Sequence, residues 1–146
     1  MSIRYLFGLA VLAITLSFCL ESAQAANQIQ QFFNDGARDV KSVPVPAMKR
    51  AILDHEFQAV DSALRAVQSM PTVSLSDRAA IERYKAIVQD KRDELNGANG
   101  FIQISDAQLD SFSNYVVQDM EQADTIVTMS FVTLLLIILL IVLIVR

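Results

Sequence analysis

A run of 20 residues without a charged side chain precedes Arg146 and constrains the fold more than any other feature of the chain. It covers residues 126–145 and reads IVTMSFVTLLLIILLIVLIV. A helix of this length, rising about 1.5 Å per residue, would be about 30 Å long, which matches the hydrocarbon thickness of a bilayer. The sequence therefore predicts a transmembrane helix over residues 126–145.

A second apolar stretch, residues 5–20, lies near the N-terminus. It follows a basic start and precedes a small-x-small cleavage site that ends at Ala25, which is the pattern of a secretory signal peptide over residues 1–25. Cleavage between Ala25 and Ala26 would remove Cys19, the single cysteine, and leave a body without disulfides. The alternative is a retained signal anchor, which would make a two-span hairpin.

Two other anchoring schemes fit the sequence less well. Acylation of Cys19 would need a small residue before it, where Phe18 stands. A glycolipid anchor needs a cluster of small residues upstream of the apolar tail, but bulky residues are interleaved in the stretch 111–116.

The charges that flank the C-terminal run predict its orientation. Asp119, Glu121 and Asp124 precede it and Arg146 follows it, and basic flanks stay on the cytoplasmic side. A translocated N-terminus agrees with this orientation. We therefore expect a single-pass protein of the bacterial inner membrane, with its N-terminal body in the periplasm and its C-terminus in the cytoplasm. A eukaryotic secretory membrane is the alternative.

Helical periodicity marks four segments of the body, residues 26–125, and none of them shows sustained alternation of the strand kind. In the first, apolar residues recur at three- and four-residue steps and Gly36 weakens the pattern. Pro44 and Pro46 then break the helix, because proline lacks an amide proton and restricts the preceding residue. The stripe of this segment consists of Ile29, Phe32, Phe33, Ala37 and Val40.

The second segment covers residues 47–70 and ends before Pro71. Its charges predict two ion pairs at four-residue spacing, Arg50 with Asp54 and Asp61 with Arg65, on a solvated face. Its apolar steps of four and three are typical of a narrow seam in a helical bundle. The seam consists of Leu53, Phe57, Val60, Leu64 and Val67.

The third segment begins at Ser74 or Ser76, either of which can cap the first turn, with Asp77 at the positive end of the helix dipole. It ends at Asn96-Gly97. The aliphatic stem of Lys91 fills one gap in its stripe, which otherwise consists of Ile81, Tyr84, Val88 and Leu95.

The fourth segment starts with a capping box formed by Ser105 and Gln108. From there the apolar spacing continues without proline or glycine into the C-terminal run. It predicts one helix over residues 106–146, of which about half stands outside the bilayer as a stalk packed against the second and third helices. The stalk is acidic, because no Lys or Arg occurs between Arg92 and Arg146.

These patterns predict an all-α fold. We expect a small antiparallel helical bundle in which the last helix continues into a C-terminal transmembrane helix. The domain boundaries that follow are a signal peptide at residues 1–25, a helical domain at residues 26–125 and a membrane helix at residues 126–145.

The sequence carries little equipment for catalysis. His55 is the single histidine, and its neighbours on a helix point about 100° apart, so a solvent-facing residue is expected rather than a catalyst or metal ligand. Asp90, Asp93 and Glu94 lack the pattern of a calcium loop and indicate a solvated face. We therefore predict no catalytic, metal or cofactor-binding residues, and no enzyme activity.

Partners are expected in or near the membrane. Residues 38–94 hold ten basic and nine acidic side chains, which excludes a concentrated basic patch for nucleic acid. The predicted function is an interaction module or an accessory subunit of a membrane protein complex, bound to another membrane or periplasmic protein. The alternatives are a membrane-active or envelope-bridging protein of the lysis, pore or fusion type, and an enzyme that uses Asp, Glu, Ser and His55. Hydroxyl residues in the C-terminal run also allow homo-oligomers.

Overall fold

Helices make up all the regular structure of residues 27–146, the part of the chain that this computed structural model describes; for residues 124–126 and 131 it describes the backbone alone. Within this part of the chain, residues 27–42 are helical. They are followed by α2 (Pro46–Gln68), α3 (Leu75–Asn96), a short 3-10 helix η1 (Asp106–Gln108), α4 (Leu109–Ile126) and α5 (Phe131–Val145).

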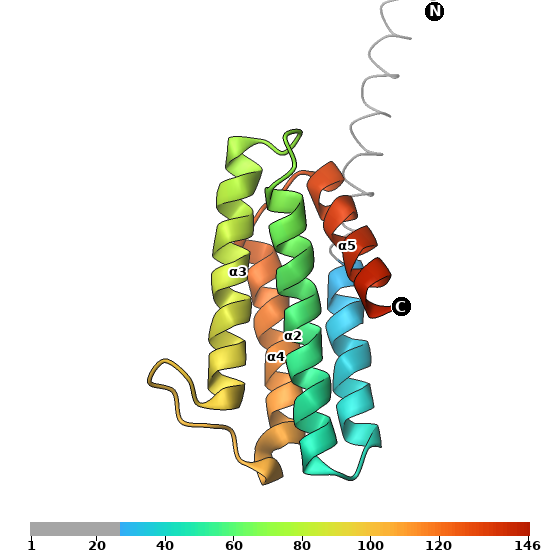
Figure 1. Ribbon diagram of the computed structural model, residues 1–146, viewed down its shortest axis with the longest axis vertical. Helices are drawn as coiled ribbons and strands as arrows, with labels where there is room; N and C mark the ends of the chain where they lie inside the picture. The colour runs from blue at the N-terminus through green and yellow to red at the C-terminus, as the bar shows by residue number, and fades with distance from the viewer. Residues whose placement is uncertain (1–26) are drawn as a thin grey trace, which may run out of the picture.

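The helices alternate in direction and pack side by side (Figure 1). Helix α2 lies between the helix of residues 27–42 and α3, and α4 packs against both α2 and α3. Helix α5 turns back and crosses obliquely over α2 and the helix of residues 27–42. The predicted all-α antiparallel bundle is therefore confirmed.

The predicted apolar stripes form the core. Every residue of the seam on α2 is buried, and the stripes on α3 and α4 join it in one cluster. In the helix of residues 27–42, Phe32 is half-buried and the rest of its stripe is buried. The spacing of the apolar residues was therefore sufficient to identify the faces that meet.

The helix ends also follow the predicted signals. Pro46 occupies the first turn of α2, and the Ser74 side chain accepts a hydrogen bond from the Asp77 backbone N–H at the start of α3. Gly97 ends α3 with φ of 68°, a left-handed conformation that favours glycine. The Ser105 backbone N–H donates to Gln108 Oε1 at 3.3 Å, as a capping box requires.

The prediction of one helix over residues 106–146 is wrong. Helix α4 ends at Ile126, and α5 begins at Phe131 after a break in which Val127 and Ser130 have extended backbones. The physical reason is burial: a straight helix would carry Ile137 and Ile141 away from the bundle, whereas the break lets both of them enter the core. Apolar periodicity does not reveal such a turn.

The break also divides the apolar run that was predicted to span a membrane. Helix α5 has 15 residues. Among the described residues, no helix combines the length and the apolar character needed to cross a bilayer. The predicted signal peptide and its cleavage site at Ala25 and Ala26 lie outside the described residues.

The acidic stalk is largely neutralised by the helices beside it. Lys49 Nζ donates to Asp110 at 2.5 Å and Lys91 Nζ lies 3.0 Å from Asp119. Arg50 Nη2 lies 3.2 Å from Asp106. These contacts fasten α4 to α2 and α3.

One of the two predicted ion pairs on α2 is wrong. Arg50 turns away from Asp54 and donates to the carbonyl oxygens of Leu95, in the last turn of α3, and of Ile104, in the segment after it. Asp54 pairs instead with Arg92 at 2.8 Å. Burial opposes ionisation of Asp54, but the hydrogen bond and charge of Arg92 outweigh it and lower its pKa. The other predicted pair, Asp61 with Arg65, is confirmed at 2.7 Å.

Candidate functional site at the C-terminal helix

The carboxylate of Asp77 holds the start of α5 against the bundle. Its Oδ1 accepts a hydrogen bond from the Ser130 backbone N–H at 3.0 Å. Its Oδ2 accepts from Ser130 Oγ at 2.6 Å and from Thr133 Oγ1 at 2.7 Å. Asp77 and Thr133 are both buried, so the bond between them is shielded from water, whereas Ser130 is exposed and its two bonds are part-buried. We refer to Asp77, Ser130 and Thr133 as the Asp77 cluster.

The local sequence explains the position of Asp77. Ser74 caps α3, which places Asp77 in the first turn of that helix. Ser130 caps α5 in the same way, because its side chain accepts from the Thr133 backbone N–H. The carboxylate therefore faces the positive ends of two helix dipoles, where a negative charge is most stable.

The electrostatics of Asp77 follow from this arrangement. Burial alone would raise the pKa of the Asp77 carboxyl. The hydrogen bonds with Ser130, Thr133 and Ser74 outweigh burial and lower the pKa below its ordinary value. Asp77 is therefore an anion at neutral pH. A charged acceptor strengthens each of its three hydrogen bonds to the break and to α5.

One face of α5 packs into the core. Thr133, Ile137 and Ile141 recur at four-residue steps and are buried. Ile137 lies beside Ile29 and Leu64, so α5 is seated over the helix of residues 27–42 and α2.

The rest of α5 exposes apolar side chains, most of them opposite this buried face and two, Ile144 and Val145, at the end of the helix. Val132 is 64% exposed, Leu139 62% and Leu143 69%. A patch of aliphatic side chains of this kind is unusual on the surface of a soluble domain. It consists of Val132, Leu135, Leu139, Val142, Leu143, Ile144 and Val145. We refer to these residues as the apolar face of α5.

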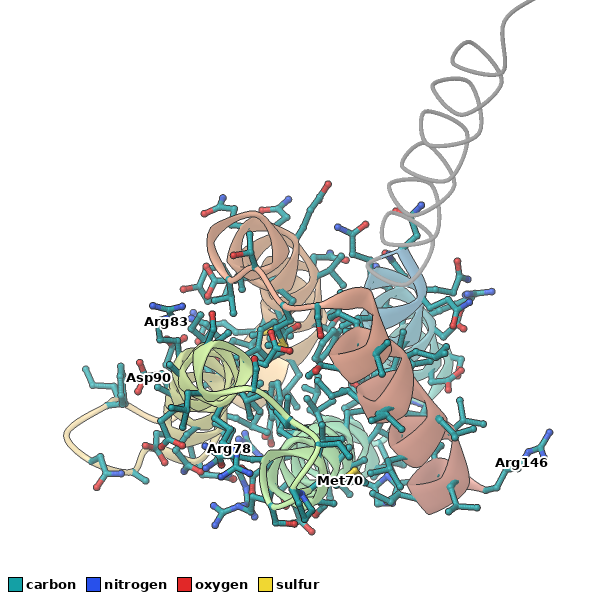
Figure 2. All side chains as sticks on the ribbon, turned by 90° about the horizontal axis from the view of Figure 1, so that it is seen from above. Met70, Arg78, Arg83, Asp90 and Arg146 are labelled. Atoms are coloured by element: carbon teal, nitrogen blue, oxygen red, sulfur yellow. The ribbon has the colours of Figure 1, made fainter. Side chains whose placement is uncertain are left out.

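Figure 2 shows how this helix lies on the molecule. Seen from above, α5 crosses one side of the bundle, and Arg146 extends away from the body at its end. On the far side of α2, Arg78 Nη2 donates to Met70 O at 3.0 Å and joins α3 to the turn before it. The turn after α2 is therefore tied down next to the Asp77 cluster.

The residues that the sequence singled out for chemistry are spread over the bundle. His55 is exposed on α2, as predicted. Asp90 is exposed, but the prediction of a solvated face is wrong for Asp93, which is 7% exposed. Asp93 accepts hydrogen bonds from Gln89 at 2.9 Å and Asn99 at 2.8 Å. Its role is to fix the turn after α3.

Lys91 shows more than the sequence indicated. Its stem fills the stripe of α3 as predicted, and its buried ammonium group donates to Glu94 at 2.7 Å and to Tyr115 Oη at 2.6 Å. It also pairs with Asp119. Burial would lower the pKa of Lys91, but these partners outweigh burial and raise it. Lys91 is thus a structural cation between α3 and α4.

Comparison with known proteins gives no family. The chain matches no protein-family model, and neither a curated protein nor a solved structure matches it. Within residues 27–146, no group of three or more His, Cys, Asp and Glu side chains is placed to hold a metal ion. The candidate site therefore consists of the Asp77 cluster and the apolar face of α5.

Sequence reasoning found Asp77 but missed its partners. It placed Asp77 in the first turn of α3 for the helix dipole, which is correct. The signal for the partners was present in Ser130 and Thr133, which fit an N-cap and its third residue inside the apolar run. A hydroxyl residue at an N-cap position could have indicated the new helix start.

Proposed function

We propose that the protein is a non-enzymatic helical module that attaches to a membrane through its C-terminal apolar segment, residues 126–145. The single observation that carries this proposal is the apolar face of α5, exposed on a helix that has no charged side chain. Fully burying one such aliphatic side chain contributes about 1.5–3 kcal/mol. Seven of them together favour transfer into hydrocarbon strongly.

Attachment proceeds by release of α5 from the bundle. Ile137 and Ile141 exchange an apolar core for apolar lipid, so their transfer costs little. Residues 127–130 then become helical, and the 20-residue run reaches the thickness of a bilayer. The cost is the loss of the hydrogen bonds that Asp77 accepts from Ser130 and Thr133, together with the exposure of apolar bundle residues that α5 covers, such as Ile29 and Leu64. The Asp77 cluster therefore helps to set the balance between docked and inserted α5.

The body then acts as the interacting part. Its helices are held together by the core and by ion pairs between α4 and its neighbours, so it keeps its shape when α5 leaves. In this proposal the body lies in the bacterial periplasm, residues 1–25 are its export signal, and it serves as an accessory subunit of a membrane protein complex.

Flotation with lipid vesicles tests the proposal. The full chain and the triple variant Leu135→Gln, Leu139→Gln, Leu143→Gln are mixed with vesicles of neutral phospholipid and separated by density. These substitutions alter the apolar face of α5 and leave its buried face intact. We expect the unaltered chain to float with the vesicles and the triple variant to lose at least about nine-tenths of this binding.

A matched control uses apolar residues that are exposed elsewhere. Leu75 is 84% exposed and Ile102 91% exposed, and neither lies on α5. The double variant Leu75→Gln, Ile102→Gln should float like the unaltered chain. Equal flotation of the triple variant, or loss of flotation in the control, would contradict the proposal.

A second candidate function is supported by the same docked helix. A helix that is stored on a folded body and can be released into lipid is also what a lysis or pore protein requires. Entrapped dye separates the two: an anchor leaves the vesicles intact, whereas a membrane-active protein releases the dye as it binds.

A further inference from the structure

A pocket of about 570 Å³ lies between the helix of residues 27–42 and α2. Its volume is within the range of small-molecule sites in proteins. Nine of its ten lining residues belong to these two helices, and Val145 is the single contribution of α5. The pocket therefore does not depend on whether α5 is docked or inserted, and an inference from it stands apart from the proposed function.

The wall of the pocket combines apolar and acidic groups. Phe32, Met48 and Ile52 supply an aromatic ring and flexible aliphatic surface. Asp35 and Asp39 supply carboxylates from the facing helix, of which Asp35 is already paired with the exposed Arg38. No Lys or Arg is among the described residues that line the pocket. An anion would meet repulsion here, and a cation would meet attraction.

The most unusual group in the pocket is Glu56. The residue is 8% exposed, and none of the described residues donates a hydrogen bond to its carboxyl group. The carboxyl lies directly against Gly36, where an added Cβ atom would overlap it. A buried carboxyl without a partner costs free energy. Burial, with a smaller contribution from the charge of Asp39, raises the pKa of Glu56 to about 8.

We propose that this pocket binds an organic cation with an apolar body, such as a quaternary or tertiary ammonium group, whose charge pairs with Glu56 and Asp39. The apolar body contacts Met48 and Ile52, and the ammonium group can also lie over the ring of Phe32. A bound cation supplies the partner that the Glu56 carboxyl lacks among the described residues.

The lining favours this class over a metal ion. The described residues contain no group of His, Cys, Asp and Glu side chains placed to hold a metal. The aliphatic and aromatic wall would contribute nothing to a bare ion, but it shields the hydrocarbon part of an organic cation from water. Glu56 and the apolar wall therefore point to the same kind of ligand.

Nuclear magnetic resonance of the full chain in lipid nanodiscs tests the site with benzyltrimethylammonium as the probe. This ion has the same charge at every pH, and neopentylbenzene is its neutral isostere. We expect saturable shifts of the methyl signals of Met48 and Ile52 with the cation. The methyl signal of Met120, in the core away from the pocket, should not move.

The Glu56→Gln variant tests the role of the charge. It keeps the shape of the side chain, so we expect the affinity for benzyltrimethylammonium to fall by about tenfold or more while neopentylbenzene binds unchanged. Glu121→Gln, which removes an exposed carboxylate on α4, is the matched control and should not alter either affinity.

A measurement on the unaltered chain serves if Glu56→Gln fails to fold. Because a cation prefers the ionised carboxyl, its affinity should rise by about tenfold or more between about pH 6 and about pH 9. The other charged groups that face Glu56 are Asp35, Asp39 and His55. The rise must therefore persist in His55→Gln, which removes the imidazole from the pocket wall.

Three results would overturn the inference. The first is the absence of saturable shifts at Met48 and Ile52. The second is equal affinity of Glu56→Gln and the unaltered chain for the cation. The third is an affinity for neopentylbenzene that matches the affinity for benzyltrimethylammonium, since the pocket would then be merely hydrophobic.

Discussion

Two buried carboxyl groups of this protein have opposite surroundings. Asp77 and Glu56 are 7% and 8% exposed as whole residues, but the Glu56 carboxyl has the more deeply buried surroundings. Asp77 accepts hydrogen bonds from Ser130 and Thr133, whereas none of the described residues donates one to the Glu56 carboxyl. The pKa of Asp77 is lowered and the pKa of Glu56 is raised.

Burial and partners together decide what a buried acid does: burial raises the pKa of Glu56, and hydrogen-bond donors lower the pKa of Asp77. Hydrogen bonds and two helix N-termini keep Asp77 charged, so it can hold α5. Glu56 faces Gly36 and an apolar pocket, so it stays protonated at neutral pH until a cation arrives. Asp77 stabilises the contact between α3 and α5. Glu56 lowers the stability of the fold and, in the proposed site, supplies the charge that pairs with the cation.

The largest effect is expected from Asp77→Ala. The substitution leaves Ser130 and Thr133 without their charged acceptor, and we expect the docking of α5 to weaken by about 3 kcal/mol. Amide hydrogen exchange in α5 should accelerate by about two orders of magnitude in detergent-free buffer. Asp90→Ala, an exposed carboxylate on the same helix, is the control. Unchanged exchange in α5 would show that the Asp77 cluster does not hold the helix.

An intermediate effect of opposite sign is expected from Glu56→Gln. A folded chain keeps the Glu56 proton up to about pH 8, whereas an unfolded chain releases it near the ordinary value of 4.5. The unfolding free energy of the unaltered chain should therefore decrease as pH rises from 4.5 to about 8. Glu56→Gln should remove this decrease and be more stable than the unaltered chain at the upper end.

Denaturant unfolding at a series of pH values measures this difference. The Asp77 carboxyl has the opposite effect on the pH profile. Because its pKa is lowered in the folded chain, the unfolding free energy that it contributes is lost as pH falls below 3.8. Glu121→Gln should follow the unaltered chain throughout. Parallel pH profiles for Glu56→Gln and the unaltered chain would mean that the Glu56 carboxyl is satisfied in solution.

The smallest effect is expected from Gly36→Ala. The new methyl group would overlap the Glu56 carboxyl, which can move out of the pocket because it lies at the end of a flexible side chain. We expect a gain of about 1 kcal/mol from helix propensity and from hydration of the carboxyl. The pKa of Glu56, followed by carbon-13 resonance of its carboxyl group, should fall toward its ordinary value. An unchanged pKa would show that the Glu56 carboxyl does not rest against Gly36.

Much of the bundle could be predicted from local sequence. The seam from Leu53 to Val67, the cap at Ser74 and the stop at Gly97 each depend on residues within a few positions of one another. The all-α architecture and the order of its helices follow from such signals. The start of α5 could not be recognised within the apolar run before Arg146, because Leu, Ile and Val are compatible with every face of a continuous helix.

The pairing of charges could not be predicted from spacing. Arg50 and Asp54 stand four residues apart on α2, yet each finds a partner beyond that helix. Asp93 belongs to an acidic cluster in the sequence, yet it is buried because the turn after α3 closes over it. Spacing along one helix predicts ion pairs only between side chains of that helix. Tertiary packing brings in charged and polar partners from other elements.

The sequence by itself determined the helices, the faces that pack and the presence of one segment too apolar to be an ordinary surface helix. The tertiary structure alone decided that α5 turns back at residues 127–130, that Asp77 meets Ser130, and that the Glu56 carboxyl lies against Gly36. The physical reason is range. Periodicity and caps act within a turn or two of helix, whereas a buried carboxyl is stabilised or destabilised by groups that the fold brings from 20 to 56 residues away.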